Sequence, residues 1–304
     1  MLLPGLWGMV GCGFDPTFHR PNVIAAAPDG SFLVLNDSQA KRLLVLDRNF
    51  RLIREITHPN LYNAWGVGVT DREIIVLNNR STGVGQNRAE REAFTVYEVL
   101  YFDHQGNLRR ARSWEGARSP LKAAGGFHRD VDGSLVIADY RQNCLVRVDP
   151  HGEFAGTIAT YGTEPGYLWY PNDVCGTLDG GLLVADQYNS RLQLFDGDGT
   201  FRQVVSARGD DPGFMNFPQY VTRDRDGNVY VTELGTMRVS MFDHTFSFVR
   251  TMSPPRRDEA ELFQLFGLCV LEDPRRVVVV DSLNNRLYVF DGQGAFLETV
   301  DRVR

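Results

Sequence analysis

A repeated block of about 47 residues is the sequence feature that most limits how this chain can fold. Each copy begins with an apolar run, continues through an Asp/Gly turn into a β-branched strand, passes through a polar turn, and closes with another strand that ends in Asp. The closing aspartates lie 56, 46, 47, 47 and 48 residues apart, at Asp47, Asp103, Asp149, Asp196, Asp243 and Asp291. Regular internal spacing of this kind indicates a fold assembled from repeated structural units.

Each copy contains three clear strand patterns and a weaker fourth, separated by turns rich in Gly and Asp. A single four-stranded sheet cannot cover both of its faces, so neighbouring copies must pack against one another. The pattern predicts an all-β fold, a six-bladed β-propeller of four-stranded antiparallel blades that occupies the whole chain. We expect the blades at residues 18–57, 61–115, 121–160, 168–207, 215–252 and 263–300.

The fourth copy shows the repeat most completely. It reads Pro-Asn-Asp-Val at 171–174, Leu-Leu-Val-Ala-Asp at 182–186 and Asn-Ser-Arg-Leu-Gln-Leu-Phe-Asp at 189–196. This pattern resembles the NHL repeat, as does the spacer at 161–167, and the resemblance covers nearly the whole chain. It implies the propeller fold, but NHL-type propellers include protein-binding, RNA-binding and enzymatic members, so the resemblance leaves the function open.

Composition narrows the classes of partner. The formal net charge is −6, from 32 Lys and Arg against 38 Asp and Glu, whereas nucleic-acid binders usually carry a basic surplus. We therefore expect no nucleic-acid partner. The four cysteines form no CxxC pair and fit free thiols in a reducing compartment. No apolar run approaches the roughly 20 residues of a membrane span, so we expect a cytoplasmic protein without a membrane partner.

Strand order predicts which residues share a face. The turns between the second and third strands of each blade lie at one end of the propeller, together with the crossings from blade to blade, and we call this end the top face. The residues that begin the innermost strands there are Asn22, Trp65, Gly125, Asn172, Gln219 and Phe266. Those that begin the turns are Asp37, Asn79, Asp139, Asp186, Glu233 and Asp281. Such a ring of oxygens suits Ca²⁺.

An alternative reading of the turn carboxylates is structural. In four blades an arginine follows the carboxylate by five residues, and we predict that each pair ties its turn together: Arg42, Arg191, Arg238 and Arg286. Blades 2 and 3 break this rule. Blade 2 carries Asn79 and an insertion at 80–95, which we expect to form a lid or binding loop.

Blade 3 supplies the candidate catalytic residues. It keeps Asp139, replaces the arginine with Cys144, and places His128 in its first strand. His128 can act as a general base or a metal ligand, or pack as a hydrogen-bonded strand residue. Cys144 can act as a nucleophile or fill a small space in the core.

A metal site is the second catalytic alternative, with Ca²⁺ or Zn²⁺ as the possible ion. Asn22 and Asn172 resemble the Asn metal ligands of gluconolactonase-like propellers, and Asp173 is the candidate for the Asp of that family. Peptidyl-amidoglycolate lyase, another NHL-like enzyme, uses three His, and here His19, His58 and His128 offer three imidazoles. This resemblance implies a metal-assisted hydrolase or lyase.

Aromatic residues gather on the predicted top face, and exposed aromatic rims are typical of peptide, sugar or protein docking. They are Trp65, Tyr140, Trp169, Tyr170, Tyr188, Tyr220 and Phe266. The candidate ligand-binding residues are Trp65, Asn79, Arg129, Tyr140, Arg141, Asn172, Asp173, Tyr188, Gln219, Tyr220 and Phe266. Two functions follow. One is a propeller that binds a peptide, protein or small ligand at the mouth of its channel on the top face, and the other is an enzyme with its site at the same mouth.

Overall fold

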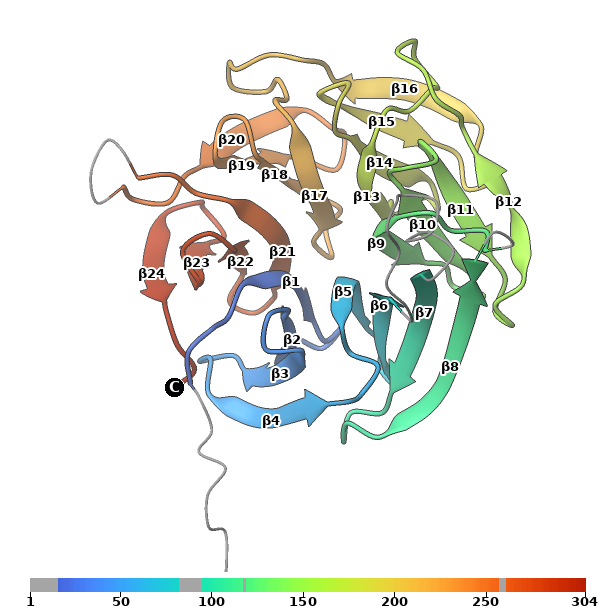
Figure 1. Ribbon diagram of the computed structural model, residues 1–304. Coiled ribbons are helices and arrows are strands. Elements are labelled where there is room, and N and C mark those ends of the chain that lie inside the picture. The colour runs from blue at the N-terminus through green and yellow to red at the C-terminus, as the bar shows by residue number, and fades with distance from the viewer. Residues whose placement is uncertain (1–15, 82–94, 117–118, 257–260) are drawn as a thin grey trace, which may run out of the picture.

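The computed structural model describes residues 16–81, 95–116, 119–256 and 261–304. Within these residues 24 strands form six four-stranded antiparallel sheets, arranged as blades around a central axis (Figure 1). The predicted all-β, six-bladed propeller is confirmed. No helix in the described ranges is both long and apolar enough to cross a membrane.

Each blade runs from an inner strand at the axis to an outer strand at the rim, in chain order. Blade 1 consists of β1 (Pro21–Ala26), β2 (Phe32–Asp37), β3 (Arg42–Asp47) and β4 (Leu52–Thr57). Blade 2 consists of β5 (Asn63–Val69), β6 (Ile74–Ser81), β7 (Thr95–Phe102) and β8 (Leu108–Glu115). Blade 3 consists of β9 (Ala124–Arg129), β10 (Leu135–Asp139), β11 (Cys144–Val148) and β12 (Phe154–Ile158). Blade 4 consists of β13 (Pro171–Gly176), β14 (Leu182–Asp186), β15 (Arg191–Phe195) and β16 (Phe201–Ser206). Blade 5 consists of β17 (Pro218–Arg223), β18 (Val229–Glu233), β19 (Arg238–Phe242) and β20 (Phe248–Met252). Blade 6 consists of β21 (Leu265–Leu271), β22 (Arg276–Asp281), β23 (Arg286–Asp291) and β24 (Phe296–Val300).

Burial explains why the second and third strands of each repeat are clear in the sequence and the fourth is weak. The second and third strands are covered on both faces, so β14 and β15 are buried at every position and read as nearly continuous apolar runs. The fourth strand forms the rim of the blade, and most of its side chains are partly or fully exposed, as in β16. The apolar core lies between neighbouring blades, where for example Val34 and Leu43 of blade 1 pack in one cluster with Val76 and Leu100 of blade 2.

The ring closes where blade 6 meets blade 1. Leu33 and Leu44 share a buried cluster with Val278 and Val280, and the backbone N–H of Val303 donates to the carbonyl of Pro16 at 2.8 Å. The apolar segment at 3–7 is a further candidate for closing the ring beside the C-terminal strand, and it lies outside the described residues.

The predicted carboxylate–arginine clamps are present in three of the four blades. Nε of the arginine lies 2.9 Å from Asp37 in blade 1, 2.7 Å from Asp186 in blade 4 and 2.9 Å from Glu233 in blade 5. Blade 6 differs from the prediction. There Asp281 accepts hydrogen bonds from Asn284 Nδ2 and from the hydroxyl of Tyr288, while Arg286 pairs with Glu261.

A second hydrogen bond identifies the residue of blade 2 that takes the place of the carboxylate. In the other blades the carboxylate accepts from a backbone N–H of the crossing that enters its own blade, as Asp186 does from Trp169 at 2.7 Å. In blade 2 the acceptor is Asn78, which accepts from the N–H of Tyr62 at 3.0 Å. The equivalent of the turn carboxylate is therefore Asn78, one residue before the expected Asn79. The insertion at 80–95 falls mostly on residues 82–94, outside the described part of the chain.

Candidate functional site on the top face

The three candidate catalytic residues of blade 3 do not come together. Asp139 is fully buried and accepts hydrogen bonds from the backbone N–H groups of Lys122 and Gln142 and from Gln142 Nε2, so Gln142 takes the place of the missing arginine. Strand β10 pairs Asp139 with Ala124 but pairs Val136 with His128, which places His128 toward the other end of the sheet. Cys144 is 5% exposed, and burial raises the pKa of its thiol to about 12. Its thiol is therefore protonated at neutral pH and a poor nucleophile.

The candidate metal residues bind neighbouring blades. Asn22 donates to the carbonyl of Ala64 at 3.0 Å, and Asn172 donates to the carbonyl of Gln219 at 2.8 Å. Asp173 accepts from the N–H of Val221 at 2.9 Å. Within the described ranges, no group of three or more His, Cys, Asp or Glu side chains is placed to hold a metal ion. His19 and His58 make separate local contacts, with Thr17 and with Asn60.

The aromatic residues of blades 3 to 5 do come together. The rings of Tyr140, Tyr170 and Tyr188 form a row, with centroids 4.7 Å and 4.4 Å apart and the last pair nearly parallel at 8°. Trp169 and Phe217 meet Tyr188 edge-on at 5.7 Å and 6.0 Å, and Tyr161 meets Trp169 in the same way at 6.0 Å. We call these six residues the aromatic surface: Tyr140, Tyr161, Trp169, Tyr170, Tyr188 and Phe217.

The backbone holds these rings in place. Tyr170 and Phe217 each precede the proline that begins an inner strand, and both have positive φ, 57° and 50°. A large residue in this conformation costs roughly 1–2 kcal/mol and needs support from its surroundings. The N–H of Tyr170 donates to Asn143 Oδ1 at 2.8 Å, and the N–H of Trp169 donates to the clamp carboxylate of Asp186. The clamp of blade 4 thus also positions the aromatic surface.

Four of the six rings are exposed to solvent. Tyr161 is 59% exposed, Tyr188 43%, Trp169 37% and Phe217 36%. Scattered apolar side chains are common on protein surfaces, but rings in mutual contact form a continuous patch, and such patches mark interaction sites. Tyr170 lies deeper in the row, and its burial raises the pKa of its phenol to about 12, so this phenol stays uncharged at neutral pH.

Carboxylates lie in the crossings that carry four of the six rings. These crossings, residues 159–170 and 207–217, contain Glu164, Asp210 and Asp211, all exposed, against one arginine, Arg208. Asp210 accepts from Asn216 Nδ2. Of the residues that the structure describes, none forms an ion pair with Glu164 or Asp211. The rings of the crossings therefore lie beside a surplus of carboxylates, while the exposed Arg141, next to Tyr140, supplies positive charge at the blade 3 end of the surface.

The crossing into blade 2 contains a ring at the position of Trp169, and this ring contacts a cation. Tyr62 occupies the position of Trp169, because the N–H of each donates to the residue at the clamp position of its blade. Lys41 Nζ lies 4.0 Å from the centroid of the Tyr62 ring, a cation–π contact within the chain. The described residues place no cation in this way on the rings of blades 3 to 5.

Most of the remaining predicted residues lie in or around the central channel. Tyr220 is 4% exposed, and its hydroxyl donates to the carbonyl of Trp65 at 3.2 Å. Gln219 is buried beside it, and the ring of Phe266 lies 6.1 Å from that of Tyr220. Four residues line a cavity that extends toward the face opposite the top face: His128, Arg129, Asp173 and Tyr220. Arg141 is exposed in the turn of Tyr140, and Asn79 borders the insertion.

Sequence reasoning missed two members of the aromatic surface, Tyr161 and Phe217. The repeat pattern identifies Phe217, because Phe217-Pro218 occupies the same place in its repeat as Tyr170-Pro171. Tyr161 lies in the spacer between blades 3 and 4, and the equivalent position of the next spacer is Arg208, so the repeat did not mark it as an aromatic position.

The chain matches no model of a known protein family and no curated protein. Its fold resembles solved propellers of diverse activity. A streptogramin B lyase structure aligns with a TM-score of 0.62 at 11% identity, covering 94% of this chain and 84% of that one. A nidogen/laminin complex gives 0.62 at 14% identity, covering 85% and 89%. A catalytically inactive virginiamycin B lyase from Staphylococcus aureus, solved with quinupristin, gives 0.56 at 12% identity, covering 92% and 82%. At these identities the likeness concerns the fold alone, and by that measure the chain is a six-bladed β-propeller.

Proposed function

We propose that this chain is an NHL-like propeller that binds a protein partner on the aromatic surface, and that the partner presents an extended segment carrying Lys or Arg. The observation that carries the proposal is the continuous set of six rings on the top face. Its exposed members lie in turns and crossings, where a large ring is not needed to form the turn. Aromatic residues held rigidly at a surface lose little entropy on binding and are enriched among the residues that dominate binding energy.

The charge around the rings favours a partner segment that is basic. Glu164 and Asp211 attract a basic partner, and the exposed ring faces attract the same cations through their quadrupole. The contact between Lys41 and Tyr62 shows this chemistry at the repeat-equivalent position. A basic side chain of the partner would take the place over Trp169 or Tyr188 that Lys41 takes over Tyr62.

Binding is better supported than catalysis on the top face. Asp139 and Cys144 are buried within the framework of blade 3, and His128 lies apart from them. Propellers of similar fold include both a lyase and a member of a nidogen/laminin complex, so the fold is compatible with either function. The aromatic surface favours the second.

A selection from random twelve-residue peptides displayed on phage tests the proposal. We expect the protein to enrich peptides that carry Lys or Arg, and the dissociation constant of a selected peptide to rise about tenfold or more in Tyr188→Ala. One well-placed ring contributes on the order of 1.4 kcal/mol, which is a factor of ten in affinity.

Phe154→Ala is the matched control, because Phe154 is 56% exposed on the outer strand β12 of blade 3. Its affinity for the selected peptide should equal that of the wild type. The proposal fails if the selected peptides are acidic or neutral, or if Tyr188→Ala and Phe154→Ala bind them equally well.

A further inference from the structure

A cavity of about 580 Å³ occupies the central channel below the layer that holds Trp65 and Phe266. Tyr220 of blade 5 closes its upper end by reaching across the axis to the carbonyl of Trp65 in blade 2, the blade opposite in the ring. The lining extends from there to Pro28, Thr70 and Glu272 in the turns between first and second strands. The cavity therefore opens on the face opposite the aromatic surface and is separated from it by Tyr220.

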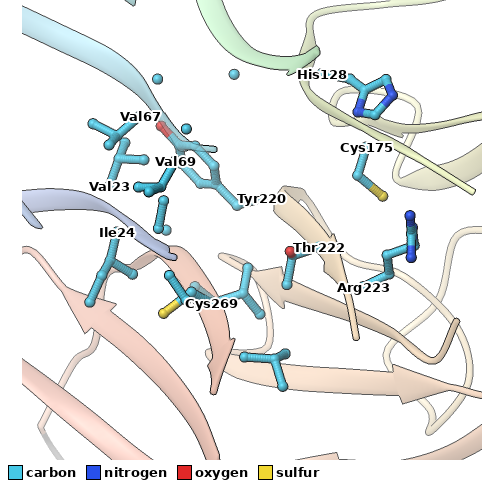
Figure 2. A pocket seen from close by; sticks show the side chains of 18 of the residues that line it. Val23, Ile24, Val67, Val69, His128, Cys175, Tyr220, Thr222, Arg223 and Cys269 are labelled. Carbon is cyan, nitrogen blue, oxygen red and sulfur yellow. The ribbon is translucent and has the colours of Figure 1, made fainter. Parts of the chain in front are cut away.

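The two sides of this cavity differ in chemistry. Blades 1, 2 and 6 supply an apolar wall, which includes Val23, Ile24, Val67, Val69 and Cys269 (Figure 2). Burial raises the pKa of the Cys269 thiol, so this group is also neutral. A wall of this kind accepts hydrocarbon, and a cavity of this volume is within the range of small-molecule sites.

Blades 3, 4 and 5 supply a polar wall. His128, Cys175, Thr222 and Arg223 lie together on the side of the cavity away from Val23 and Val67 (Figure 2). The imidazole of His128 packs so closely on blade 4 that a Cβ at Gly176 would lie 2.4 Å from the ring. Its Nε2 lies 3.3 Å from Asp130 Oδ1, so Asp130 balances its charge when the ring is protonated.

Arg223 is a cation on this wall without a carboxylate partner among the described residues, and Arg129, at the same position of the repeat in blade 3, is a second. The Nε of Arg223 donates to the carbonyl of Gly176 at 2.7 Å and its Nη1 to the carbonyl of Asp224 at 3.3 Å. Neither acceptor is charged, and within the described ranges no carboxylate forms an ion pair with it. A partly buried guanidinium whose partners are only carbonyls retains a full positive charge for a ligand.

The acidic groups of the lining are already satisfied. Asp224 is 2% exposed and accepts from Asn228 and Tyr230, with Arg275 at 3.1 Å. Glu272 accepts from Arg275 at 3.2 Å and from the N–H of Arg225. At the closed end burial raises the pKa of Asp173 to about 8, which keeps that carboxyl neutral at pH 7. The charges on the lining that no carboxylate of the described residues balances are thus those of Arg223 and Arg129.

We propose that the cavity binds a small monocarboxylic acid, with its carboxylate on Arg223 and Thr222 and its hydrocarbon body against Val23, Val67 and Cys269. The planar donors of one guanidinium can hold both oxygens of a carboxylate at once.

Isothermal titration with octanoate, octyl phosphate, 1-octanol and octylammonium tests the class of ligand. These probes share the hydrocarbon chain and differ in the head group. We expect octanoate to bind with a stoichiometry of one and more tightly than octyl phosphate, and 1-octanol and octylammonium to bind at least tenfold more weakly than octanoate. Equal affinities for octanoate and 1-octanol, or tighter binding of octyl phosphate than of octanoate, would overturn the assignment.

Two arginines provide matched variants for the location of the site. Arg223→Gln should weaken octanoate binding at least tenfold. Arg109→Gln should leave it unchanged, because Arg109 lies on the outer strand β8 of blade 2, away from the cavity, and pairs with Asp103. Equal losses in the two variants would show a diffuse electrostatic effect and refute the site.

A third variant tests the cavity without touching the arginine, in case Arg223→Gln does not fold. Ala25 lines the cavity at the repeat position of Cys175, Thr222 and Cys269. Ala25→Phe should fill the space and abolish octanoate binding while the affinity of the top-face peptide stays the same. Undiminished octanoate binding by a folded Ala25→Phe protein would place the ligand elsewhere.

Discussion

Replacing Asp173 with Asn should make the protein more stable at neutral pH, and the gain should disappear in acid. The Asp173 carboxyl is 7% exposed in the channel, and burial raises its pKa from 3.8 to about 8. In the unfolded chain the same group ionises near its ordinary value. Between these two pKa values the folded state keeps a proton that the unfolded chain releases. The free energy of unfolding therefore falls as the pH rises from about 4 to about 8, and it levels off above that range.

The size of the effect follows from that interval. A pH of 7 is about 3 units above the pKa of Asp173 in the unfolded chain, and each unit corresponds to about 1.4 kcal/mol. Burying this carboxyl therefore lowers the free energy of unfolding at pH 7 by roughly 4 kcal/mol. Asn does not titrate, and its Oδ1 can still accept the hydrogen bond from the N–H of Val221. With an unfolding entropy of roughly 0.6 kcal/mol/K for a chain of this length, the melting temperature should rise by about 6 °C at pH 7.

Urea and thermal unfolding at pH 4, 5.5, 7 and 8 would measure this difference. The stabilities of wild type and Asp173→Asn should coincide near pH 4 and separate steadily as the pH rises. Parallel stability curves for the two proteins, or a variant less stable than the wild type at pH 7, would show that Asp173 is ionised in the folded protein. Asp173 would then again be a candidate for binding a cation.

Two further predictions concern the framework. Asp186→Ala should lower the free energy of unfolding by roughly 3–5 kcal/mol, because it leaves the 8% exposed Arg191 buried without its carboxylate. The control Asp198→Ala, in an exposed turn, should change this free energy little. Equal losses for the two variants in urea unfolding would count against the clamp. Cys144 should resist iodoacetamide at pH 8 in the native protein and react once urea is added, as peptide mass spectrometry would show. Rapid native alkylation would contradict the burial that raises its pKa to about 12.

The fold was predictable because turns and buried strands recur in register. The Asp that closes each third strand marks the strand end to within one residue, as at β3 and β11, because a carboxylate there accepts N–H groups of the following turn. The outer strands face solvent and lack that regularity, so their pattern was weaker.

The site was predictable only in part. Tyr140 and Tyr188 were identifiable because bulky rings stood in turns that do not need them, and strand order placed them on one face. The upper end of the channel cavity is closed by one residue, Tyr220, at a position that is glycine in blades 2, 3 and 6 (Gly66, Gly126 and Gly267). Sequence spacing does not show how far a side chain reaches across an axis. Spacing also does not show which partner a side chain binds, and the contacts of Arg286 and Asn78 differed from the repeat rule.

Site-specific photocrosslinking tests the central claim, that the aromatic surface binds a basic segment, most directly. A photoreactive phenylalanine analogue would replace Tyr188 in one protein and Phe154 in another, each mixed with a lysine-containing peptide from the phage selection. The account predicts a covalent adduct from position 188 that excess unlabelled peptide suppresses, and none from position 154. Crosslinking from position 154 with equal yield, or none from position 188 while the peptide still binds, would contradict it.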